Sequence, residues 1–173
     1  MWISLVTLFF HQWEEYRIAS TFPGMVNKVM YHSKMPDRFP LNTRTAFIIN
    51  VCIGWTAYFL AALLAEKAVW LGIATMIVSI GNIIAHTGVF NVKGKTLYNA
   101  GMVTCLLLFI PCTSYFFYII HSSHLVHLTD YLIGVPLGVI INIVGIVKLI
   151  SWLGDKETEF VFSNRHLLPG DRK

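Results

Sequence analysis

Charged side chains are scarce in this 173-residue chain. Asp, Glu, Lys and Arg make up only 13% of it, whereas a soluble domain carries about a quarter. Its 13 basic and 9 acidic residues are too few to cover a 19.6-kDa globule, which excludes an ordinary soluble fold. The hydrophobic fraction of 55%, without periodic Gly or Pro, excludes disordered and fibrous chains. With a mean hydropathy of +0.63, the composition is typical of a small protein that crosses a membrane several times.

Cysteine and the signature motifs of soluble enzymes are also sparse. Cys52, Cys105 and Cys112 lie in apolar runs without C-x-x-C spacing, so we expect small core residues and no disulfide framework or zinc knuckle. The sequence has no P-loop, no G-x-G-x-x-G and no G-x-S-x-G motif. Its basic residues lie in short loops and not beside aromatic clusters, which argues against nucleic acid as a partner. The lipid bilayer is therefore the expected partner.

Five apolar segments approach the roughly 20 residues that a bilayer requires. They cover residues 2–19, 46–64, 69–89, 98–120 and 131–152. We expect an all-α, polytopic transmembrane helical bundle in a single domain over residues 1–155, with a polar cytoplasmic tail over residues 156–173. The first segment lacks a basic start and a cleavage site, so it is expected to be retained. Its uninterrupted apolar part ends at Phe10, so its polar half needs shielding by other helices or water.

The basic residues favour one orientation in the membrane. With five spans, the first loop, the third loop and the tail share one side. That side carries eleven of the 13 basic residues, namely Lys28, Lys34, Arg38, Arg44, Lys93, Lys95, Lys148, Lys156, Arg165, Arg172 and Lys173. Lys67 lies on the other side, and Arg17 ends the first span on the basic side. The positive-inside rule then predicts the N-terminus outside and the C-terminus in the cytoplasm, and a four-span arrangement ranks second.

The polar half of the first segment holds the strongest candidate site. His11, Glu14 and Glu15 have the spacing i, i+3, i+4, so on a helix they share a face. Each acid would cost about 2.5–3.5 kcal/mol at the bilayer centre, and a bound cation would offset that cost. Imidazole and carboxylate suit zinc, iron or manganese. The spacing alone equally allows a structural role, in which Glu14 pairs with Arg17 at a wetted helix end.

A second group of polar residues lies near the inner end of the third span. Asn82 and His86 are spaced i, i+4 and share a helical face. If spans one and three run in the same direction, His86 lies at a depth similar to that of His11. Tyr98 and Asn99 begin the fourth span on the same side. A lone histidine in an apolar helix is more often a core residue than a ligand, but the matching depth favours a shared site.

These motifs resemble those of the HXXEE-domain membrane proteins of bacteria. The His-x-x-Glu-Glu motif of that family is His11 to Glu15 in this chain, and its second recurring histidine matches His86. The family's Tyr-x-Pro-Gly motif, followed by an apolar run, matches residues 98–111. Ala100 stands where the motif has proline, which removes a preset φ from a helix start.

The resemblance spans residues 5–145, and it implies a multi-pass protein of the bacterial plasma membrane with a functional His/Glu site. It implies no particular activity, because the family is uncharacterised. The diglutamate also looks similar to that of CAAX-type intramembrane proteases, which carry Glu-Glu-x-x-x-Arg. Here the spacing from Glu15 to Arg17 is two residues too short, so that likeness is only a chemical analogy.

A weaker candidate follows the fourth span. His121, His124 and His127 recur every third residue, and Asp130 follows them. Three imidazoles and a carboxylate could hold zinc, but in the predicted orientation they face the outside, away from the first site. A wet interfacial loop is the more common explanation for this pattern.

The leading hypothesis is a membrane protein with a metal site in the inner half of the bundle. Its ligands or acid/base groups are His11, Glu14, Glu15 and His86, and the divalent ion is zinc in preference to iron or manganese. If the protein is an enzyme, we expect metal-dependent hydrolysis of a lipid-like substrate, with a glutamate, Glu14 or Glu15, as the base. The alternatives are a proton- or ion-coupled transporter of a small molecule and a structural partner protein without catalysis. Second-tier candidates are Arg17, Asn82, Tyr98, Asn99, His121 and His124.

Overall fold

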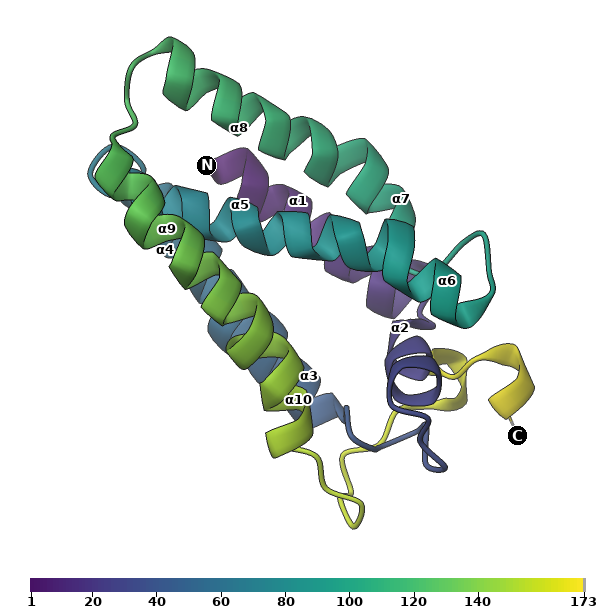
Figure 1. The fold of residues 1–173 in the computed structure, drawn as a ribbon. Helices are drawn as coiled ribbons and strands as arrows, with labels where there is room; N and C mark the ends of the chain where they lie inside the picture. Colours follow the sequence, from purple (N-terminus) through teal and green to yellow (C-terminus); the bar gives the residue numbers. More distant parts are fainter. Residues whose placement is uncertain (173) are drawn as a thin grey trace.

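Helices form the regular structure of residues 1–172, the part of the chain that the computed structural model describes, and no strand occurs in that range (Figure 1). The predicted all-α class is confirmed. Four helices are long and apolar enough to cross a membrane, namely Thr43–Leu63, Val69–Gly94, Met102–Ser122 and Leu128–Trp152. A chain with four such helices has the architecture of a polytopic membrane protein.

Each long helix contains π-helical as well as α-helical turns. In chain order the segments are α3 (Thr43–Phe47), η3 (Ile48–Trp55) and α4 (Thr56–Leu63); α5 (Val69–Ile84), η4 (Ala85–Val89) and α6 (Phe90–Gly94); α7 (Met102–Thr104), η5 (Cys105–Phe109) and α8 (Ile110–Ser122); α9 (Leu128–Ile140), η6 (Ile141–Lys148) and α10 (Leu149–Trp152). A π-helical turn widens the helix and changes which face the following residues present, and such turns are frequent at functional sites.

The first helix is the exception among the five predicted spans. It consists of α1 (Trp2–Trp13) and η1 (Glu14–Ile18), so it is shorter than the other four and ends in charged residues. It is therefore not among the four membrane-length apolar helices of residues 1–172. The helix nevertheless packs along α4 and α8, and the Trp2 ring meets the Phe59 ring edge-on at 5.8 Å.

Local chemistry explains where the helices begin and end. The long helix that begins with α3 starts three residues before the predicted position, because the Asn42 side chain accepts a hydrogen bond from the Thr45 N–H at 2.9 Å. The long helix that begins with α5 continues to Gly94, and Lys95 then turns the chain with a φ of 49°. The long helix that begins with α7 starts at Met102, because Gly101 has a φ of 104°, which favours glycine.

The closest pairing of helices is that of α5 with α9, which lie against each other in Figure 1. Gly134 and Gly138 form a G-x-x-x-G pattern on α9. A Cβ on Gly134 would lie 2.8 Å from the Ile73 Cβ, and one on Gly138 would lie 2.6 Å from the Ala74 carbonyl oxygen. The absence of both side chains therefore allows the two backbones to touch. Asn142 adds an interhelical hydrogen bond to the Ile77 carbonyl at 3.1 Å, as expected for a single polar residue in a span.

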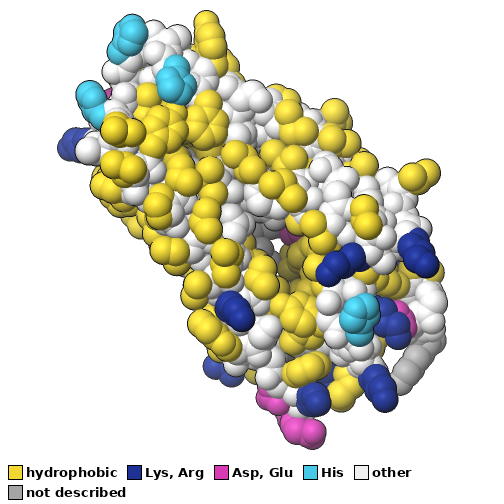
Figure 2. Space-filling view, viewed as in Figure 1, with side chains coloured by type: hydrophobic (Ala, Val, Ile, Leu, Met, Phe, Trp, Pro, Cys, Tyr) yellow, Lys and Arg dark blue, Asp and Glu magenta, His cyan; other side chains and the backbone are white. Residues whose placement is uncertain are grey.

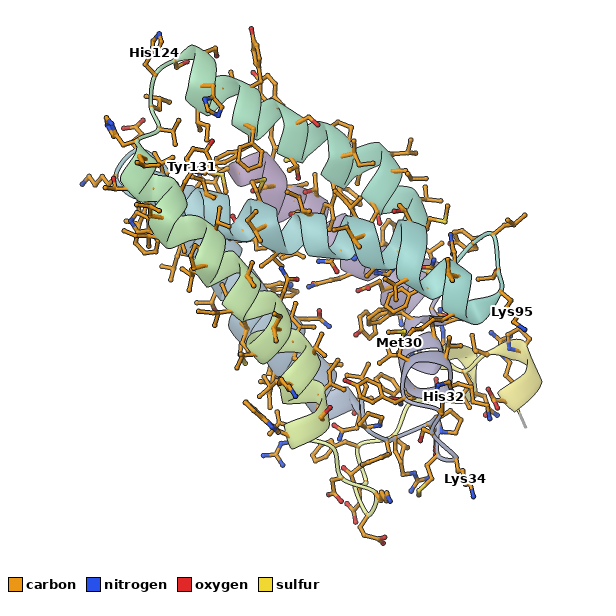
Figure 3. All side chains as sticks on the ribbon, in the orientation of Figure 1. Met30, His32, Lys34, Lys95, His124 and Tyr131 are labelled. Carbon is orange, nitrogen blue, oxygen red and sulfur yellow. The ribbon has the colours of Figure 1, made fainter. Side chains whose placement is uncertain are left out.

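A layer of shorter segments covers one end of the bundle. It comprises α2 (Phe22–Gly24), η2 (Met25–Met30), η7 (Asn164–His166) and η8 (Pro169–Asp171). The tail is folded against the first loop, because Phe162 and Leu167 are buried and Lys28 pairs with Asp171 at 3.1 Å. Most of the Lys and Arg visible in Figure 2 gather at this end. Figure 3 places Lys34 and Lys95 here, and His124 at the opposite end of the molecule.

Candidate metal centre

Three buried side chains from two helices meet at one point inside the bundle. His11 comes from α1, Glu15 from η1 and His86 from η4, and their exposed fractions are 2%, 3% and 1%. The Glu15 Oε1 atom lies 3.4 Å from His11 Nε2 and 3.2 Å from His86 Nε2. The two imidazole rings meet edge-on with centroids 4.9 Å apart. Within the described chain, this is the group of His, Cys, Asp and Glu residues whose ligand atoms all lie within 4.8 Å of one another.

The His86 ring is held by the Asn99 amide. The Asn99 Nδ2 donates to the His86 carbonyl at 2.7 Å and to Asn91 Oδ1 at 2.6 Å, which directs the Asn99 carbonyl oxygen at the ring. That oxygen lies 2.7 Å from His86 Nδ1 and is only an acceptor, so Nδ1 carries the hydrogen. In the neutral ring, His86 Nε2 is left with a lone pair that faces Glu15.

The His11 ring is oriented in the same way by a hydroxyl group. The Thr104 Oγ1 donates to Glu14 Oε2 at 2.6 Å and lies 2.9 Å from His11 Nδ1, so it accepts the hydrogen of Nδ1. The His11 Nε2 then also presents a lone pair toward Glu15. Among the buried side-chain atoms of residues 1–172, it is one of two that lack a hydrogen-bond partner.

Two nitrogen lone pairs and a carboxylate oxygen thus point at a common space. This arrangement is repulsive unless a cation or a proton lies between the three groups. In a tetrahedral site with metal–ligand bonds of roughly 2.0–2.1 Å, ligand atoms are about 3.3 Å apart. The observed separations of 3.4 and 3.2 Å match that edge length. Binding of each histidine through Nε2, with Nδ1 held by a second polar group, is the usual arrangement around a metal.

Glu14, the other predicted ligand on this helix, lies outside the group. Its carboxylate accepts four hydrogen bonds: from the Val103 N–H at 3.2 Å, the Thr104 N–H at 2.8 Å, the Thr104 hydroxyl at 2.6 Å and the Tyr98 hydroxyl at 3.1 Å. The two N–H groups belong to the first turn of α7, where an anion is favoured. The Glu14 carboxylate therefore caps the long helix that begins with α7, while Glu15 lies beside the histidines.

The turn over residues 98–101 connects the glutamates to the histidines. The Tyr98 hydroxyl binds Glu14, and the Asn99 amide binds His86, so both second-tier candidates are neighbours of the group. Gly101 lies directly against both rings, because a Cβ there would be 2.7 Å from His86 Nδ1 and 2.9 Å from His11 Cε1. The segment that resembles the family's Tyr-x-Pro-Gly motif thus positions the residues that resemble its His-x-x-Glu-Glu motif.

A cavity of about 70 Å³ adjoins the group. His11, Glu15 and Asn82 line it, together with apolar side chains of α5, η6 and α10. Figure 2 shows an opening in the apolar surface on this face of the molecule, with an acidic side chain visible within.

The remaining second-tier candidates lie away from the group. The Arg17 side chain is exposed at the end of η1. The His121 Nε2 lies 2.8 Å from the Tyr131 hydroxyl, and His124 is exposed with a φ of 53°. Figure 3 shows His124 and Tyr131 together at the end of the bundle opposite Lys95. His127 and Asp130 begin α9, where the Asp130 carboxylate accepts the His127 N–H at 2.9 Å.

Three neighbours of the group were not predicted from the sequence to lie at the site. Thr104 joins Glu14 to His11, the Cys105 sulfur lies 3.8 Å from His11 Nδ1, and the Phe109 ring lies 4.7 Å from the His11 ring. Thr104 and Cys105 follow Gly101 by three and four residues, so their helical spacing from the turn was the available signal. Both residues lie in an apolar run, in which a single hydroxyl or thiol does not by itself indicate a site.

The fold and the site together define an apolar helical bundle with a buried His/Glu/His group. A family model described as "Protein of unknown function with HXXEE motif" matches residues 2–116, more than half of the chain. The chain belongs to this family, which confirms the resemblance found in its motifs. No curated protein and no solved structure matches the chain.

Proposed function

We propose that His11, Glu15 and His86 bind one divalent metal ion. The observation that carries this proposal is the convergence of two Nε2 lone pairs on one carboxylate oxygen in a buried space, with no hydrogen bond to His11 Nε2. Each Nδ1 already has a polar partner, so each Nε2 is the nitrogen left to bind a metal ion.

Zinc suits this ligand set. Catalytic zinc sites use three protein ligands, among them the combination of two histidines and one glutamate, and keep a fourth position open. Two imidazoles and a carboxylate also accommodate iron or manganese. Elemental analysis of the purified protein identifies the ion.

The reaction that such a site favours is hydrolysis of a lipid-like substrate. A metal ion with an open position makes bound water nucleophilic near neutral pH. The adjoining cavity has mostly apolar walls and reaches His11 and Glu15, while the Asn82 side chain supplies a polar group beside it. Glu14 makes four hydrogen bonds as a cap, so Glu15 is the glutamate that we assign to the metal and its water.

We also propose five membrane crossings, with the N-terminus outside and the C-terminus in the cytoplasm of a bacterial cell. The first helix packs along α4 and α8, and large apolar side chains such as Trp2, Ile3 and Phe10 are exposed on it, as a lipid-facing helix requires. Lys34 and Lys95 lie at one end of the molecule in Figure 3, which supports a cytoplasmic assignment of that end.

The second candidate function is a proton-coupled transporter, in which a proton takes the place of the metal ion. One proton shared between Glu15 and either imidazole would relieve the same repulsion of lone pairs. Loss and gain of that proton would then drive a proton-coupled transporter. The structural alternative, a partner protein without catalysis, predicts that Glu15→Gln leaves both metal content and cellular role unchanged.

Metal content separates these functions. The full chain is purified from membranes and analysed by elemental mass spectrometry beside His11→Ala, Glu15→Gln and His86→Ala, with His121→Ala as the matched histidine control. We expect about one ion per chain in the wild type and in His121→Ala, and loss of most of it in the three site variants. A wild type without metal, together with solute uptake that requires a pH gradient in vesicles, would establish the transporter instead.

A further inference from the structure

A larger groove lies on the other side of the first helix. It has a volume of about 700 Å³ and separates the first helix from α3 and η3. Its apolar walls include Phe9 and Trp13 on one helix, and Phe47, Val51 and Trp55 on the other. Four of these five side chains are 40–58% exposed. The groove is therefore lined mainly by apolar side chains that are exposed to the hydrocarbon of the membrane.

A chain of hydrogen bonds forms the floor of this groove. The Trp55 Nε1 donates to Gln12 Oε1 at 2.6 Å, the Gln12 Nε2 donates to Asn50 Oδ1 at 3.2 Å, and the Asn50 Nδ2 donates to the Tyr16 hydroxyl at 3.1 Å. Each amide oxygen is used as an acceptor within the chain. The Tyr16 hydroxyl, an acceptor here, retains its own hydrogen to donate. The floor therefore favours a ligand rich in acceptor oxygens.

Cations gather where the groove reaches the end of the first helix. The exposed Arg17 and the half-buried His166 line this mouth, and an Arg165 Nη donates to the Arg17 carbonyl at 2.5 Å. Burial lowers the pKa of His166, a hydrogen bond to the Ser20 carbonyl opposes this shift, and the nearby charges of Arg165 and Arg17 add to it. The described residues that line the groove include no Asp or Glu. The mouth is thus complementary to an anion.

These three zones follow one another along the first helix: apolar side chains at Phe9, donors at Gln12 and Tyr16, and a cation at Arg17. A membrane phospholipid has the same order of acyl chain, ester oxygens and phosphate. We propose that this groove binds an anionic phospholipid of the inner leaflet, with one acyl chain between Trp13 and Trp55 and its phosphate at Arg17 and Arg165. Basic residues at a membrane surface favour anionic lipids in this way.

Gln12, Tyr16 and Asn50 line both this groove and the smaller cavity beside Glu15, so they form the partition between lipid and metal. The bound lipid therefore also defines the class of substrate for the metal centre. That second step rests on the proposed function, whereas binding in the groove does not require a metal ion.

Photolabelling tests the binding. The full chain is reconstituted in phosphatidylcholine vesicles that contain phosphatidylglycerol with a diazirine in one acyl chain, irradiated, and mapped by mass spectrometry. We expect the adducts to concentrate in peptides that contain Phe9, Trp13, Phe47 and Trp55, and unlabelled phosphatidylglycerol to compete about fivefold better than phosphatidylcholine.

Two pairs of variants sharpen the test. Val51→Trp fills the groove and should reduce the adducts severalfold, whereas Val139→Trp, at a lipid-exposed site on α9, should leave them unchanged. Arg17→Gln should abolish the preference of about fivefold, whereas Lys95→Gln should retain it. Even labelling of all lipid-facing helices, or a Val51→Trp protein labelled like the wild type, would overturn the proposal. Metal content, measured on the same preparations, reports separately on the metal centre.

Discussion

Glu14 and Glu15 are neighbours in the chain, yet their carboxylates lie in different surroundings. Glu14 accepts a hydrogen bond from the Thr104 hydroxyl at 2.6 Å and caps the long helix that begins with α7, while Glu15 lies 3.2 Å from His86 Nε2. The Thr104 hydroxyl also lies 2.9 Å from His11 Nδ1, so it links the Glu14 cap to the His11 ring. The Glu14 carboxylate thus contacts the start of α7, whereas the Glu15 carboxylate contacts the two histidines.

This division predicts opposite consequences for two matched variants. Glu14→Gln turns an amide NH2 toward N–H donors, so we expect the free energy of unfolding to fall by about 2–3 kcal/mol, while the folded fraction keeps its metal. Glu15→Gln should keep the fold and lose the metal. Unfolding in detergent, followed beside elemental analysis, measures both properties. If the two variants behave alike, the assignment of separate roles is wrong.

Gly101 should tolerate no side chain. Its φ of 104° and the nearby His86 and His11 rings both oppose a Cβ, so Gly101→Ala should cost at least about 2 kcal/mol and weaken metal binding. Gly88→Ala is the control, because nothing lies within 4 Å of a Cβ at that helical position. It should be neutral or stabilise the protein by up to about 1 kcal/mol. Thermal unfolding with and without added zinc compares them.

Two threonines provide a further matched pair. Thr104→Val removes the acceptor for His11 Nδ1 and a donor to Glu14, and loss of such a partner typically lowers metal affinity roughly 10–100-fold. The Thr113 hydroxyl is buried without a hydrogen-bond partner, so Thr113→Val should be neutral or stabilising. Competition with a zinc-binding dye measures both affinities. Equal affinities would show that the Thr104 hydroxyl does not orient His11.

Much of the site could be predicted from the sequence. His11 and Glu15 follow helical spacing, and His86 lies at a similar depth on a helix that the hydropathy pattern predicts, so their meeting needed only the bundle geometry. The separation of Glu14 from Glu15 could not be predicted, because it depends on where the first turn of α7 lies in space. A helix N-terminus attracts a carboxylate only when tertiary packing brings the two together.

The fold could likewise be predicted from the sequence only in part. Continuous apolar runs predicted four helices within a few residues, since the bilayer fixes their length. The tail reads as polar, yet Phe162 and Leu167 are buried against the first loop. Two separated apolar residues give no periodic signal. The close contact of Gly24 with the backbone of Leu168, where a Cβ would lie 2.7 Å from the Leu168 nitrogen, likewise arises only in three dimensions.

X-ray absorption at the edge of the copurified metal tests the central claim most directly, because it reports the ligands as well as the ion. We predict one metal ion per chain, with nitrogen and oxygen ligands at about 2.0–2.1 Å and the scattering pattern of two imidazoles. A purified wild-type protein without metal, or a metal whose spectrum contains no imidazole, would contradict the assignment of His11, Glu15 and His86 as a metal centre.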